Sequence, residues 1–153
     1  MKIFFLVLIG INTLNSFSLT RFNANNGVIS DSATNLKWQD SYSDNNNNIK
    51  YTTWKNGINY CENLNLNGQR DWRLPNIVEL TSLVDDRIHN PVINAVFQNT
   101  SLNDYWSSTT NSNINDYAKV LSFQSGSMGN YSKSYTHYIR CVKDGVTPIF
   151  YGF

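Results

Sequence analysis

The feature that most constrains the fold of this chain is its pair of cysteines, Cys61 and Cys141, which stand 80 positions apart in a sequence of 153 residues. Two cysteines are too few for a disulfide-rich miniature scaffold or for a zinc site with four cysteine ligands. They can form one bridge across much of the chain, or they can remain thiols. The compartment in which the protein folds decides between these states.

The N-terminus indicates export from the cytoplasm. Lys2 is followed by an apolar run over residues 3–11, and Ser16 and Ser18 supply the small residues of a cleavage site, as in a secretory signal peptide. The run is too short to span a bilayer, which takes about 20 apolar residues. The alternative is a buried N-terminal strand. We predict a signal peptide over residues 1–18, no membrane span after its cleavage, and a secreted or periplasmic location.

In an oxidising compartment, the simplest state of the two cysteines is a Cys61–Cys141 disulfide. The alternative is a pair of reactive or metal-binding thiols. Only His89 and His137 could then supply histidine ligands, and neither has a ligand-like spacing from a cysteine. The sequence therefore predicts one bridge, with no metal and no cofactor.

Length and composition favour one neutral domain over residues 19–153. The formal net charge is +1, and only 15% of residues are charged. Removing Lys2 with the signal peptide leaves equal numbers of basic and acidic residues. Nucleic-acid-binding proteins usually carry a clear basic excess, so we expect no nucleic-acid partner. The aromatic fraction of 14% argues against intrinsic disorder.

The hydrophobic pattern divides the mature chain into short strands, two helices and further strands. Turn-forming residues between residues 27–31 and 36–39 predict a hairpin. Helical spacing runs from Thr52 to about Leu66, and a second helix begins at Asn76, where Glu79 completes a capping box, and ends near Asp85. We also expect a helical turn over 92–97 and strands over 105–109, 117–123, 131–136 and 138–143. This order predicts an α+β fold of two helices packed on short antiparallel strands.

Several islands of sequence resemble the Lcl C-terminal domain family, a secreted bacterial domain of unknown function. The most specific is Trp72-Arg73-Leu74-Pro75 followed by the capped helix. The others contain Trp38, Tyr60-Cys61, Tyr105-Trp106 and Ile139-Arg140-Cys141-Val142-Lys143. The resemblance covers nearly the whole mature chain.

The resemblance implies a C-type-lectin-like fold, in which a cysteine on the first helix is bridged to one on the final strand. Cys61 and Cys141 occupy those places. The namesake of the family is an adhesin whose terminal domain binds sulfated glycosaminoglycans. This chain lacks both a collagen-like repeat and the basic excess that a purely electrostatic grip on a polyanion requires.

Motifs for catalysis and calcium binding are missing from the sequence. It has no Gly-x-Ser-x-Gly elbow, phosphate-binding loop or His-Glu-x-x-His. Asp85, Asp86 and Asp104 could contribute to a calcium site, but we interpret them as a helix end and a turn. Formylglycine-generating enzymes share the lectin-like fold and use a cysteine pair on copper, which a disulfide would preclude. We therefore predict no enzymatic activity.

Most large side chains are interpreted as structural. Trp38, Trp54, Trp72 and Trp106 stand beside apolar neighbours and are expected in the core. Arg73 is expected to span loops, and Pro75 and Arg140 belong to the family islands.

The candidate binding residues lie in the C-terminal third of the chain. Lys119, Lys133 and Arg140 alternate with tyrosines and suggest a glycan platform of rings and cations, although an ordinary half-exposed sheet has the same composition. The best candidate set is Tyr131, Lys133 and Tyr135, because a strand would place them on one face.

We therefore expect an adhesin-like binding domain that recognises a glycan or a surface protein. The alternatives are an envelope assembly domain with a protein partner, for which the apolar tail over residues 146–153 is a candidate contact, and a metal or thiol enzyme.

Overall fold

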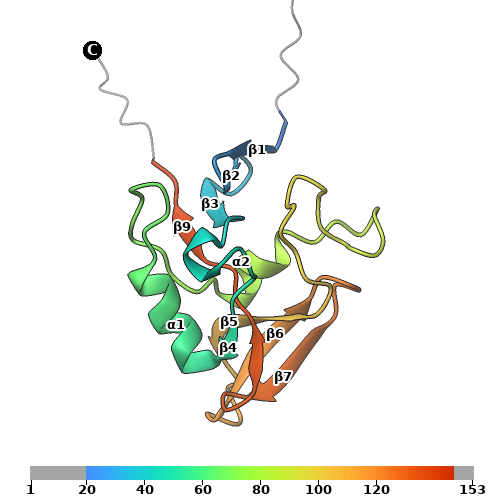
Figure 1. Cartoon of the computed structure of the whole chain (residues 1–153). Helices are drawn as coiled ribbons and strands as arrows, with labels where there is room; N and C mark the ends of the chain where they lie inside the picture. Colours follow the sequence, from blue (N-terminus) through green and yellow to red (C-terminus); the bar gives the residue numbers. More distant parts are fainter. Residues whose placement is uncertain (1–19, 147–153) are drawn as a thin grey trace, which may run out of the picture.

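The computed structural model describes residues 20–146. The expected signal peptide and all but the first residue of the apolar tail lie outside these residues. The described chain forms two sheets and two helices, joined by turns (Figure 1).

The first sheet contains the strands nearest the two ends of the described chain. Its order is β1 (Phe22–Asn25), β2 (Val28–Asp31), β3 (Leu36–Gln39) and β9 (Val142–Asp144). All three pairings are antiparallel, and β2–β3 is the hairpin that the sequence predicts. The β1–β2 turn has positive φ at both Asn26 and Gly27, which only glycine and, less often, asparagine adopt readily.

The second sheet is larger and lies below the first in Figure 1. Its order is β4 (Tyr51–Thr53), β8 (Thr136–Tyr138), β5 (Asp104–Thr110), β6 (Tyr117–Ser122) and β7 (Met128–Ser132). The prediction of antiparallel strands was wrong at one pairing, because β5 and β8 run parallel where Tyr105 faces Tyr138.

Both predicted helices are present. α1 spans Trp54–Asn63, and α2 spans Ile77–Thr81 with the predicted capping box between Asn76 and Glu79. α2 ends earlier than expected. The cause is local pairing, because Val84 forms a β-bridge with Ile93 instead of continuing the helix. Residues 92–97 accordingly form a bridge and a turn rather than a helical turn.

The segment 138–143 is not one strand, as the alternation suggested. β8 ends in the second sheet at Tyr138, and β9 begins in the first sheet at Val142. Residues 139–141 cross between the sheets, and all three are buried. The expected alternation of inward and outward faces fails here, because the chain passes through the core instead of lying on its surface.

The core has two clusters, and the crossing segment contributes to the first of them. This cluster surrounds the disulfide and includes Trp72, Trp106 and Ile139. The second surrounds Trp38 and includes Leu80 and Phe123. Trp38, Trp72 and Trp106 are at most 2% exposed, as expected, whereas Trp54 is only half-buried. The fold is therefore α+β with strands dominating, and one bridge joins Cys61 to Cys141.

The bridge should contribute strongly to stability, because it closes a loop of 80 residues in the unfolded chain. We expect the Cys61→Ala/Cys141→Ala variant to lose about 3–5 kcal/mol of unfolding free energy. Equilibrium urea unfolding of the variant and the oxidised protein measures the difference. A loss below about 1 kcal/mol would show that the loop is already restricted in the unfolded state.

Candidate functional site

The crossing segment at residues 139–141 is the point around which the nearby loops are organised. The amide of Ile139 donates a hydrogen bond to the Lys50 carbonyl at 2.8 Å. The carbonyl of Ile139 accepts one from the buried Tyr42 hydroxyl at 2.9 Å. One residue therefore attaches both ends of the loop between Tyr42 and Lys50 to the core.

Arg140 is fully buried and holds a second loop, residues 98–101. Its guanidinium donates to the carbonyls of Gln39 (3.2 Å) and Asn99 (2.7 Å). It also donates to the Asp40 carboxylate at 3.1 Å and to the Thr100 hydroxyl at 2.8 Å. A buried charge is tolerated only when it is paired and hydrogen-bonded, and Arg140 meets both conditions.

Asp40 fixes the same loop from its other side. Its carboxylate accepts the amides of Gln98 (2.9 Å) and Asn99 (3.2 Å), and its carbonyl accepts the Asn99 side-chain amide at 2.6 Å. Burial raises the pKa of the Asp40 carboxyl, while attraction to Arg140 and the two amide hydrogen bonds oppose this rise. The pair thus connects strand β3, the crossing segment and loop 98–101.

The facing loop, residues 43–48, is held by its own backbone. After a short 3-10 helix (Ser43–Asn45), the amides of Asn45 and Asn47 both donate to the Tyr42 carbonyl at 2.9 Å. Asn46 and Asn47 take positive φ values of 53° and 59°, a conformation that asparagine tolerates better than most residues. The four consecutive asparagines over residues 45–48 therefore belong to a defined turn.

An open groove of about 530 Å³ lies between these two loops. Tyr138 of β8 and Tyr51 of β4 line it as well, with ring centroids 4.8 Å apart. The Tyr51 side chain is 55% exposed. All the lining residues are uncharged: Asn47, Asn48, Ile49, Tyr51, Gln98, Asn99, Thr100, Ser101 and Tyr138.

Polar groups in the groove are free to contact a ligand. Asn47 and Gln98 are exposed, and neither side chain makes a hydrogen bond to another residue in the range 20–146. Each side-chain amide offers two donors and a carbonyl acceptor. The groove thus combines exposed side-chain amides with a tyrosine that is more than half exposed.

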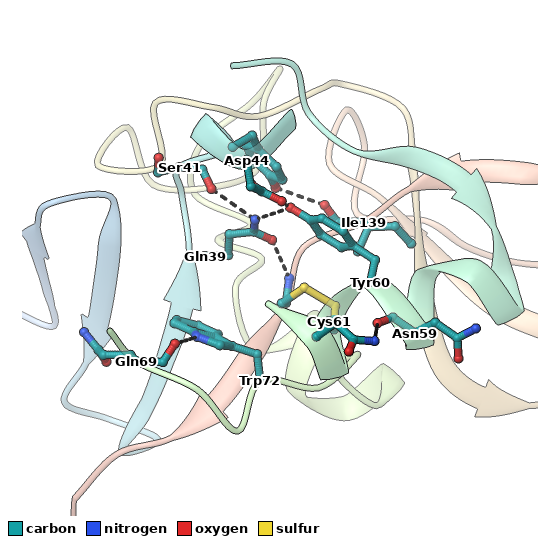
Figure 2. The surroundings of a disulfide bond; sticks show 12 residues. Gln39, Ser41, Asp44, Asn59, Tyr60, Cys61, Gln69, Trp72 and Ile139 are labelled. Atoms are coloured by element: carbon teal, nitrogen blue, oxygen red, sulfur yellow. Dashed lines mark hydrogen bonds between the residues drawn. A yellow bond between two sulfur atoms is a disulfide. The ribbon is translucent and has the colours of Figure 1, made fainter. Parts of the chain in front are cut away.

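Side chains that form hydrogen bonds surround the disulfide (Figure 2). The buried Gln39 amide donates to the Tyr60 hydroxyl at 2.7 Å and to the Ser41 carbonyl at 3.0 Å, and its oxygen accepts the Cys141 amide at 3.2 Å (Figure 2). Gln39 therefore joins α1 to the crossing segment next to the bridge.

Arg73 and Pro75 connect the two sheets. The backbone of Arg73 pairs with Val142 of β9, and the carbonyl of Pro75 accepts the amide of Ser108 in β5. The Arg73 guanidinium binds both oxygens of Glu79 at 2.7 Å. The side-chain partners of Arg73 are therefore carboxylates, those of Glu79 and Asp144.

The predicted binding set is not assembled as one strand face. Tyr131 lies on β7, but Lys133 and Tyr135 lie in the turn before β8, where alternation does not apply. The Lys133 ammonium lies 4.1 Å from the centre of the Trp54 ring and donates to the Asn115 carbonyl at 2.7 Å. Tyr135 is 60% exposed and Tyr131 is 37% exposed.

Arg140 cannot be part of the surface platform that the tyrosine and lysine pattern suggested. It is 0% exposed, and the ring of Phe97 lies 4.8 Å from its guanidinium carbon. The alternation misled because it continued a surface strand into the crossing segment. Lys119 remains half-buried on β6.

The expected positions of the acidic residues were wrong. Asp85 lies beyond the β-bridge at Val84 rather than at the end of α2, which stops at Thr81, and it pairs with Arg87. The side-chain hydrogen bond from Arg87 lowers the pKa of the Asp85 carboxyl to about 2. Asp104 begins β5 instead of lying in a turn. Over residues 20–146, no three His, Cys, Asp or Glu side chains are grouped so that they could hold a metal ion.

The groove and the ion pair beneath it leave no recognisable pattern in the sequence. Asp40 and Arg140 are 100 positions apart, and no sequence motif links the two residues. The run of asparagines was a usable signal for left-handed turns, but it gave no information about the loop it faces. Tyr51 lies in a three-residue strand that is too short for a pattern to reveal.

A model of the Lcl C-terminal domain family matches residues 27–143. The chain therefore belongs to this family. A comparison with curated proteins finds no match.

Loss of Arg140 should be severe, because it leaves the buried Asp40 carboxylate without its partner. We expect Arg140→Met to lower the unfolding free energy by about 3–5 kcal/mol. Arg73→Met is the matched control, since the Arg73 side chain is 40% exposed, and it should cost about 1 kcal/mol or less. Urea unfolding measures both variants. Equal losses would contradict the role assigned to Arg140.

His137 should make stability depend on pH. Its ring lies between the rings of Trp106 (4.6 Å) and Tyr131 (4.7 Å), and its buried Nε2 has no hydrogen-bond partner among the described residues. Burial lowers the pKa of His137, and Asp104, 4.0 Å from Nδ1, only partly opposes this. In the unfolded chain, the pKa is about 6.5.

Because the unfolded state then binds the proton more tightly, stability is full above about pH 6.5 and declines as pH falls toward the lowered folded pKa. Urea unfolding at a series of pH values should show this decline in the wild type and a smaller one in His137→Phe. The same decline in both proteins would assign the effect to other groups.

Proposed function

We propose that this chain is a secreted or periplasmic, non-enzymatic domain that recognises a glycan at the cell surface. The groove between residues 43–48 and 98–101 is the observation that carries the proposal. Sugars present hydroxyl groups that need donors and acceptors, together with apolar C–H faces that pack on aromatic rings. Asn47, Gln98 and Tyr51 offer these contacts in one open groove.

Fold and location are part of the same proposal. The bridge between α1 and the residue before β9 agrees with the arrangement expected of a C-type-lectin-like domain. A disulfide is compatible with an oxidising compartment. No helix within residues 20–146 is long and apolar enough to cross a membrane.

A second candidate function is assembly with a protein partner. Val78 of α2 is 75% exposed and Met128 of β7 is 62% exposed. Thr81, one helical turn after Val78, contacts the Met128 sulfur at 3.9 Å, so the two apolar side chains belong to neighbouring elements. Exposed apolar groups of this kind favour a protein contact when they form a larger patch.

The third candidate, a metal or thiol enzyme, has less support. Both cysteines of the chain are in the bridge, and neither is a free thiol. A copper-binding cysteine pair would require this bridge to open.

A glycan array probed with the oxidised mature protein tests the glycan proposal. We expect selective binding to a subset of glycans, because the groove has fixed walls and specific polar groups. The control is the reduced and alkylated protein, which should lose this binding. Absence of binding to every glycan, together with capture of a defined protein that Val78→Ser/Met128→Ser abolishes, would favour the second candidate.

A further inference from the structure

We infer, on the basis of the proposed glycan-binding function, that the ligand of the groove between residues 43–48 and 98–101 is an uncharged saccharide. Such a ligand is not a sulfated polyanion, and the groove lies apart from Tyr131, Lys133 and Tyr135, none of which lines it.

The surface of the groove carries little charge. Among residues 20–146, no Asp, Glu, Lys, Arg or His lines the groove. Arg140 and Asp40 lie behind the wall formed by residues 98–101, where they are buried and pair with each other at 3.1 Å. Their opposite charges largely cancel at the groove surface.

The charged residues next to the other wall contact Tyr60 instead of lining the groove. The Lys50 ammonium lies 5.3 Å from the centre of the Tyr60 ring, and Asp44 accepts a hydrogen bond from the Tyr60 hydroxyl at 3.2 Å. Neither residue lines the groove. A sulfate or carboxylate entering the groove would lose hydration and find no cation to replace it.

The backbone of both groove walls is held in place before a ligand binds. Backbone hydrogen bonds to Tyr42 set the position of Asn47, and the Asp40 carboxylate sets that of Gln98. The two side chains therefore project from fixed backbone on opposite walls. Fixed walls reduce the entropy lost on binding, which matters for a neutral sugar because it has no long-range electrostatic attraction.

Tyr51 and Tyr138 form an aromatic pair in the groove. Tyr51 packs against Tyr138 with a centroid distance of 4.8 Å while more than half of its own side chain stays exposed. The contact holds the Tyr51 ring at the start of β4, and the exposed part of the Tyr51 side chain remains available to a sugar ring. Tyr51 is thus the side chain whose removal should affect binding most and folding little.

The test is a glycan array carrying neutral oligosaccharides and heparin oligosaccharides, probed with the oxidised mature protein. We expect neutral glycans to be bound and their signal to change less than about twofold between about 50 mM and about 500 mM NaCl, since screening acts on charged contacts. Tyr51→Ala should weaken binding by about tenfold or more. Tyr135→Ala is the matched control, an equally exposed tyrosine outside the groove, and should bind like the wild type.

Three other results would each overturn a different part of the proposal: the ligand class, the site or the function. Binding restricted to heparin, with loss of signal at high salt, would overturn the uncharged ligand while glycan recognition stands. Loss of binding in Tyr135→Ala with full binding in Tyr51→Ala would overturn the groove as the site and favour the surface around Tyr131. No binding to any glycan would overturn the proposed function itself.

Discussion

The buried ion pair between Arg140 and Asp40 is the interaction on which the organisation of this domain depends. It joins strand β3, the segment that crosses between the sheets, and the loop over residues 98–101. A guanidinium suits this position because its planar fork can donate to several acceptors at once. Removing either charge would leave the other buried without compensation, so the pair fixes which loops meet at this point.

The disulfide and the Arg73–Pro75 segment also hold the crossing segment and the strand that follows it. The bridge attaches Cys141 to α1, while Arg73 extends the first sheet beside β9 and Pro75 reaches β5 of the second sheet. Residues 139–141 are therefore held by a covalent bond, a salt bridge and backbone pairing. This concentration of constraints explains how a domain built from short strands can present two fixed loops around a groove.

Much of the fold could be predicted from the sequence because its signals are local. The β2–β3 hairpin, the capping box at Asn76 and the pairing of the only two cysteines each depend on neighbouring residues or on a count. The site could not be predicted in this way. Its walls are brought together by contacts between residues far apart in the chain. The alternating pattern predicted a surface position for Arg140 because the pattern continues past Tyr138, where β8 ends.

The Arg140–Asp40 pair is expected to act as one energetic unit. A double-mutant cycle with Arg140→Met, Asp40→Leu and the double variant, followed by urea unfolding, measures the coupling free energy directly. We expect the double variant to lose less unfolding free energy than the two single variants lose together, by about 2 kcal/mol or more. The reason is that the double variant leaves no unpaired charge in the core. Single losses that add to within about 0.5 kcal/mol would contradict it.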